Sequence, residues 1–62
     1  PLIGQEASVV TWQGRDRRVE VFGAIWQARL PDHHVAALQP GDIVRVHAIH
    51  DLTLIVVPTG ET

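Results

Sequence analysis

Apolar and polar residues alternate with a period of two near the middle of the chain. Between Arg17 and Phe22, Val19 and Val21 point one way, while Arg18 and Glu20 point the other. A period of two is typical of a β-strand with one buried face. Gly23 follows, and we expect it to form a tight turn into another strand.

The next segment, Ala24 to Leu30, continues the same pattern. Every second residue is apolar, and these residues share one face: Ala24, Trp26, Ala28 and Leu30. We expect the Trp26 face to be the core face. Pro31 and Asp32 end the strand, and Asp32 could cap a single helical turn over His33 to Leu38.

The region from Pro40 to Pro58 predicts a β-hairpin. Two segments rich in β-branched residues, Asp42 to Ile49 and Thr53 to Val57, flank a polar break at His50-Asp51. Both faces of these segments carry apolar residues, which indicates burial on both sides or a place where a barrel curls over itself.

The first strand is predicted over Gln5 to Trp12. Its apolar residues fall on both parities, with Ala7 and Val9 on one face but Val10 and Trp12 on the other. Such a change of face indicates a bend or bulge, which a barrel corner requires. A turn over Gly14, Arg15 and Asp16 leads into the next strand.

Three antiparallel strands, a longer connection and a hairpin are the element order of an OB-fold, an all-β five-stranded Greek-key barrel. An SH3-like barrel is the nearest competitor. We expect residues 1–58 to form this one domain and residues 59–62 to be a disordered tail. The predicted core is Val19, Val21, Trp26, Ala28, Val44, Val46, Leu54 and Val56.

Composition supports a closed barrel. The 62 residues include no cysteine, so the fold has neither a disulfide nor a thiolate metal ligand. Methionine is absent too, and we therefore expect a fragment of a longer protein. No apolar stretch approaches the roughly twenty residues of a membrane helix. So short a chain has a thin core, and a closed barrel also removes exposed strand edges.

Few residues could support catalysis. Ser8 is the single serine, it has no Gly-x-Ser-x-Gly sequence around it, and there is no lysine. The histidines are His33, His34, His47 and His50. Their spacing does not match a metal site, so we interpret them as surface and turn residues. We expect no enzyme activity, no catalytic residue, no metal and no cofactor.

Binding is the alternative to catalysis. The net charge of −2 and the three aromatic residues argue against nucleic acid, because single-strand binders need a cationic groove with aromatic platforms. An OB-type single-stranded nucleic-acid-binding module nevertheless remains the alternative hypothesis. The candidate partner-binding residues are Trp12, Arg15, Arg17, Arg18 and Phe22.

Two interpretations are open for the aromatic residues Trp12 and Phe22. If the first two strands form a hairpin, these aromatics lie at opposite ends of it. Either one is exposed and anchors a protein contact, or they cap an open end of the barrel. The three arginines are equally open to two interpretations, a partner epitope or a solvated turn.

Glycines and core aliphatics recur at a characteristic spacing. They are Leu2-Ile3-Gly4, then Gly23 with Ile25, Trp26 and Ala28, then Gly41-x-x-Val44-x-Val46-x-x-Ile49, and finally Leu52-x-Leu54-x-Val56-x-Pro58. In these positions the chain resembles the C-terminal soluble domain of NfeD-like (nodulation-efficiency protein D) proteins over about residues 2–58.

The resemblance implies a non-catalytic interaction domain of a membrane-anchored protein. The parent would lie in the cell membrane, with this soluble domain on the cytoplasmic side. Family members pair with SPFH-type proteins (stomatin, prohibitin and flotillin relatives) and are implicated in regulating membrane protease activity. We therefore expect an SPFH/stomatin-like protein partner, with neither nucleic acid nor a small-molecule ligand.

Overall fold

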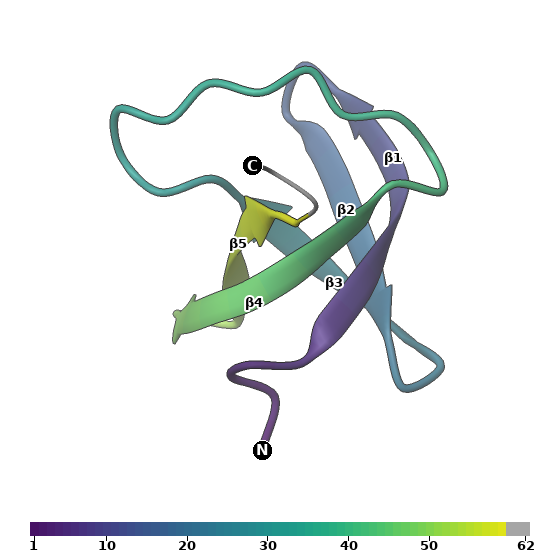
Figure 1. Cartoon of the computed structure of the whole chain (residues 1–62), viewed down its shortest axis with the longest axis vertical. Coiled ribbons are helices and arrows are strands. Elements are labelled where there is room, and N and C mark those ends of the chain that lie inside the picture. The colour runs from purple at the N-terminus through teal and green to yellow at the C-terminus, as the bar shows by residue number, and fades with distance from the viewer. Residues whose placement is uncertain (60–62) are drawn as a thin grey trace.

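Five strands close into a small barrel in a computed structural model that describes residues 1–59 (Figure 1). The OB-fold prediction is confirmed, since the strand order around the barrel is β1-β2-β3-β5-β4. No helix occurs within these residues. The strands are β1 (Glu6–Gln13), β2 (Asp16–Val21), β3 (Ala24–Arg29), β4 (Ile43–His50) and β5 (Thr53–Pro58).

Closure of the barrel depends on one parallel pairing. Strands β1, β2 and β3 form an antiparallel meander, and β4 pairs antiparallel with both β1 and β5. Strand β5 then lies parallel to β3, with Ala28 opposite Leu54. Each strand therefore has a neighbour on both sides, which protects the barrel from edge-to-edge association.

Two strands are bulged. The register of β1 against β2 shifts between Val9 and Thr11, so the predicted bend of the first strand is confirmed. Strand β4 shifts against β5 between Val46 and Ala48. A bulge exchanges the inward and outward faces of a strand, and in β1 it lets Trp12 pack against the same core as Ala7 and Val9. In β4 the apolar residues of the second parity, Ile43 and Ile49, remain 44% and 42% exposed.

The core fills the barrel with small aliphatic side chains. The buried cluster comprises Ala7, Val9, Val19, Val21, Ala28, Leu30, Val44, Val46, Leu54 and Val56. It includes every predicted core residue except Trp26. The prediction for Trp26 was wrong in degree: its side chain is only partly buried and packs against the cluster. Trp26 lies opposite Val19 and follows two exposed residues, Ala24 and Ile25, at the start of β3.

The predicted helical turn over His33 to Leu38 is wrong. The segment forms an extended loop after a tight turn, in which the His34 N–H donates to the Pro31 carbonyl at 3.1 Å and His33 has a φ of +68°. Ala36 and Leu38 pack against the core. An extended chain directs every second side chain, here Ala36 and Leu38, toward the barrel. A single helical turn is unstable in isolation, so this packing favours the extended form.

The C-terminal end of the described chain lies against β4. The Thr59 hydroxyl donates to the Ile43 carbonyl at 3.0 Å. The rest of the expected disordered tail, residues 60–62, lies outside the described residues. Within residues 1–59 there is no helix of the length and hydropathy that a membrane span requires.

Candidate partner-binding surface

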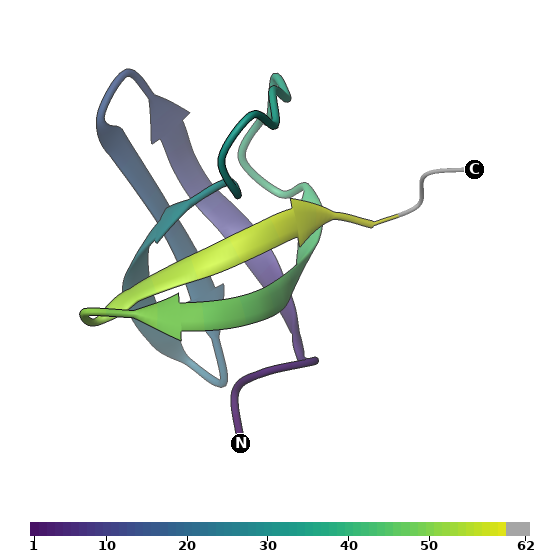
Figure 2. The same ribbon diagram turned by 90° about the vertical axis from the view of Figure 1, so that its left-hand side faces the viewer.

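The barrel has two ends with different surfaces. The tip end, defined as residues 2–6, 20–25 and 45–53, carries the β2–β3 and β4–β5 turns and the N-terminal segment. The loop end, defined as residues 10–18, 29–43 and 57–59, carries the β1–β2 turn and the long β3–β4 loop. The two ends lie on opposite sides of the molecule in Figure 2.

The β2–β3 turn presents an aromatic side chain to solvent. Val21 pairs with Ala24, so Phe22 and Gly23 form a two-residue turn. Their φ angles are +53° and +80°, and two positive values in such a turn correspond to type I′. The Phe22 side chain is 76% exposed. Phe22 is therefore exposed rather than folded over an open end of the barrel, and its role as a partner contact stays a prediction.

The β4–β5 turn repeats this arrangement with a leucine. His50 pairs with Thr53, so the turn is Asp51-Leu52, one residue later than the predicted break at His50-Asp51. The φ angles are +51° and +67°, again as in type I′. Leu52 is 79% exposed, although its apolar character suits the strand pattern. The exposed position follows from the register of the hairpin.

Backbone hydrogen bonds fasten the N-terminal segment to β4. The Gln5 N–H donates to the Leu2 carbonyl at 3.0 Å, and the Gly4 N–H donates to Val46 at 2.8 Å. Gly4 has a φ of +92°, which a glycine adopts at little cost. Leu2 consequently packs against the core, as Trp26 does, while Ile3 points outward and is 56% exposed.

Acidic side chains outnumber basic ones within the tip end. Within the tip end, the carboxylates of Glu6, Glu20 and Asp51 stand against one guanidinium, that of Arg45. Arg45 lies 3.7 Å from the Glu6 carboxylate and donates to the Gly4 carbonyl at 2.9 Å. With the histidines neutral, the tip end therefore has two excess negative charges.

The loop end holds the predicted arginine cluster, but its members have separate environments. The Arg17 guanidinium lies over the Trp12 ring, 5.0 Å from its centroid, and Trp12 packs against the core. Arg18 donates to the Asp16 carboxylate at 3.0 Å. Arg15 occupies the exposed β1–β2 turn. Trp12 thus caps the barrel, and Phe22 lies at the other end of the hairpin, as predicted.

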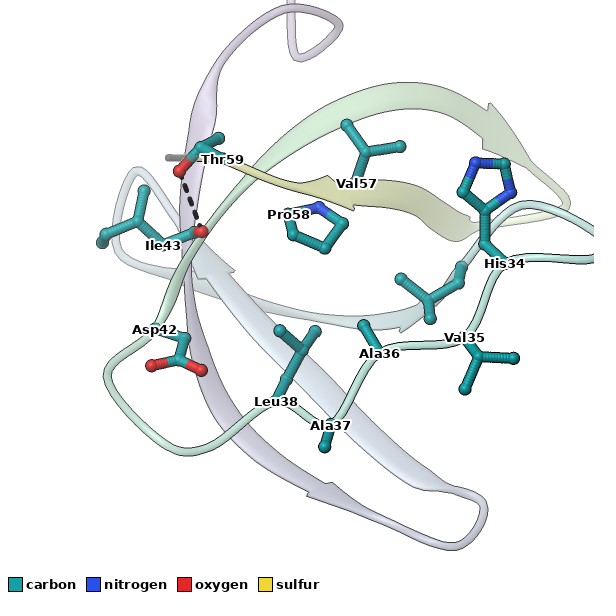
Figure 3. A pocket seen from close by; sticks show the side chains of 11 residues that line it. His34, Val35, Ala36, Ala37, Leu38, Asp42, Ile43, Val57, Pro58 and Thr59 are labelled. Carbon is teal, nitrogen blue, oxygen red and sulfur yellow. Dashed lines mark hydrogen bonds between the residues drawn. The ribbon is translucent and has the colours of Figure 1, made fainter. Parts of the chain in front are cut away.

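A groove of about 830 Å³ also opens at the loop end, between the β3–β4 loop and the ends of β4 and β5 (Figure 3). Ala36 and Leu38 point into it, whereas Val35 points away and is 98% exposed. Asp42 accepts the Gln39 N–H at 2.9 Å. Most lining residues are apolar, but the polar side chains of His34, Asp42 and Thr59 also line the groove. Each of these three makes a hydrogen bond within the fold.

The chemistry-bearing side chains are scattered. No group of three or more His, Asp or Glu residues within 1–59 is arranged to hold a metal ion. His33 and His34 lie in the exposed loop, while His47 and His50 lie on exposed positions of β4. Ser8 is partly buried on β1, between Glu20 of β2 and Ile43 of β4.

Comparisons with known proteins identify the family of this barrel. Residues 1–58 match the family model of the NfeD-like C-terminal, partner-binding domain. The chain belongs to the NfeD-like family. A similar solved structure is the C-terminal domain of stomatin operon partner protein 1510-C from Pyrococcus horikoshii, with 32% sequence identity and a TM-score of 0.81. The match covers 97% of this chain and 91% of that one. No curated protein sequence matched the chain.

The five candidate residues of this NfeD-like domain do not gather on one part of the barrel. Phe22 lies at the tip end, and the others lie at the loop end: Trp12, Arg15, Arg17 and Arg18. Their role in partner binding stays a prediction. Leu52 and Ile3 were not among the candidates, and they are 79% and 56% exposed. The signal for Leu52 was its position between the predicted break at His50-Asp51 and the strand from Thr53, and the pairing of His50 with Thr53 places it in the turn.

Proposed function

We propose that this barrel is the non-catalytic partner-binding domain of a membrane-anchored NfeD-like protein. Its partner is an SPFH/stomatin-like membrane protein, and the pair regulates membrane protease activity. The domain lies outside the bilayer on the cytoplasmic side. The family match supports a partner-binding role, and the related Pyrococcus protein is described as a stomatin operon partner.

The exposed aromatic residue, Phe22, lies at the opposite end of the barrel from the arginine cluster, and this favours a protein partner over a nucleic acid. A single-stranded nucleic acid needs cations beside exposed aromatic rings. Here Trp12 and Trp26 pack against the core, and Phe22 lies at the acidic tip end. Arg17 stacks on Trp12, while Arg18 pairs with Asp16. A protein contact requires only a small mixed surface.

If both proteins are anchored in the membrane, a small contact surface is sufficient for their association. Two proteins held in the same membrane meet at a high effective concentration, so a contact that is weak in isolation becomes occupied. The scattered placement of Ser8 and the histidines supports a binding role over catalysis.

Two measurements test this function. The full-length protein carrying this domain should co-purify from membranes with a stomatin-like protein of the same genome, and deletion of residues 1–58 should abolish the association. The domain should also fail to bind mixed-sequence single-stranded DNA and RNA at low salt. Salt-sensitive micromolar binding, lost when Arg15, Arg17 and Arg18 are replaced, would instead support the nucleic-acid alternative.

A further inference from the structure

We infer that the tip end is the surface that binds the partner, with Phe22 and Leu52 as its two main contacts. The inference rests on the proposed function and specifies the surface and the chemistry it recognises. The complementary surface is an apolar patch bordered by basic side chains on the partner protein.

Exposure of large side chains is the first argument. Phe22 and Leu52 are 76% and 79% exposed, each in the turn of a hairpin that contributes buried valines to the core. Ile3 adds a third exposed apolar side chain within the tip end, and it is 56% exposed. Aromatic and large aliphatic side chains at the centre of a contact provide much of its binding energy.

The backbone supplies an independent argument. A type I′ turn requires positive φ at both central residues, for which Asn-Gly and Asp-Gly are preferred. This chain has Phe22-Gly23 and Asp51-Leu52 instead, so a bulky side chain occupies a left-handed conformation in both turns. Such residues cost stability, and neither side chain recovers that cost by packing in the barrel. A contact with another molecule accounts for both.

The net charge of the tip end favours one class of binding partner. The two excess negative charges of the tip end repel an anionic membrane surface, and they disfavour a symmetric dimer that joins two tip ends. They attract a partner whose apolar patch carries Lys or Arg at its border. The exposed carboxylate of Asp51 belongs to the same turn as Leu52, and that of Glu20 lies two residues before Phe22.

Substitutions in the two turns can test the inference, because they should stabilise the fold while they weaken binding to the partner. Phe22→Asn gives the turn Asn-Gly, and Leu52→Gly gives Asp-Gly, both favourable for type I′. Each variant should raise the melting temperature of the protein. Each should also weaken binding to a tagged stomatin-like protein, measured with both full-length proteins in detergent, by at least about tenfold. Unfolding cannot explain a loss of binding in a more stable protein.

Val35→Asn is the matched control, because it removes an equally exposed apolar side chain at the loop end. It should leave the affinity unchanged. If the wild-type protein binds and the tip variants bind equally well, the surface is wrong although the proposed function survives. If the wild-type protein does not bind at all, the proposed function fails, and this inference fails with it.

Charge reversal tests the nature of the partner. Glu20→Lys and Asp51→Lys should each lower the affinity, with the larger loss at low salt. Two outcomes would contradict a basic protein partner. One is binding of the wild-type protein to phosphatidylglycerol vesicles that Phe22→Asn abolishes. The other is a stable dimer of the wild-type protein that the tip variants dissociate.

Discussion

The two ends of this barrel use similar residues in opposite ways. At the loop end, Trp12 is folded onto the core, and Arg17 covers its ring. At the tip end, Phe22 and Leu52 project into solvent from strained turns. An aromatic residue that packs inward contributes to stability, whereas one that remains exposed at a cost indicates a contact with another molecule. The loop end therefore contributes its aromatic residue to the fold, whereas the tip end is the one proposed to contact a partner.

The largest expected effect concerns the core that joins the ends. Leu54 is completely buried, and Leu54→Ala should lower the free energy of unfolding by about 3 kcal/mol. A domain of this size has roughly 0.05–0.15 kcal/mol per residue of stability, so this single change removes a large share. Urea denaturation of the 62-residue chain measures it. An unchanged midpoint would show that the barrel interior is not the source of stability.

Replacing the aromatic residue of each end by alanine should change the free energy of unfolding by different amounts. Trp12→Ala removes packing and the cation–π contact with Arg17, and it should cost about 2 kcal/mol. Phe22→Ala should change stability by less than about 0.5 kcal/mol, because the ring has few contacts in the barrel. Thermal unfolding followed by circular dichroism gives both values. Equal losses would remove the distinction between a folded cap and an exposed contact.

The turns should respond in the opposite direction. Phe22→Asn and Leu52→Gly should each raise the free energy of unfolding by about 1 kcal/mol, since they relieve a bulky residue from the left-handed region. Chemical denaturation provides the measurement. Destabilisation by both variants would mean that these side chains contribute to the fold, and the contrast between the ends would be lost.

The smallest effect is expected at the arginine cluster. Asp16→Asn weakens the pair between Asp16 and Arg18, whose side chains are 58% and 43% exposed at the loop end. Exposed ion pairs contribute little, so stability should change by less than about 0.5 kcal/mol. Repeating the denaturation in high salt checks that value, and a loss above 1 kcal/mol would assign the cluster a structural role.

Much of the fold could be predicted because inward and outward positions differ in chemistry. In β2, valines alternate with charged residues, and in β1 the change of parity indicated the bulge that the register shows. The loop could not be predicted in the same way. Val35, Ala36, Ala37 and Leu38 are all apolar, so their order fits a helical turn or an extended segment, and only packing on the barrel selects between them.

The candidate surface was only partly accessible from sequence. The sequence left Phe22 open between an exposed contact and a cap, and its exposure follows from the two-residue turn, since the pairing of Val21 with Ala24 leaves Phe22 outside the strands. Arg17 lies on the same face of β2 as Val19 and Val21, which the alternation in the sequence shows. Its stacking on Trp12 could not be predicted, because it depends on the register of β1 against β2 after the bulge. Leu52 continued the apolar spacing of β5, and the register of the hairpin alone shows that it lies in the turn.

Amide hydrogen exchange of the assembled complex tests the division between the ends most directly. The full-length protein is compared with and without its stomatin-like partner, and protection is followed by peptide. Binding should slow exchange in residues 2–6, 20–25 and 45–53 and leave residues 10–18 and 29–43 unchanged. Protection confined to the β1–β2 turn or to the β3–β4 loop would contradict the account, because it would place the partner at the loop end.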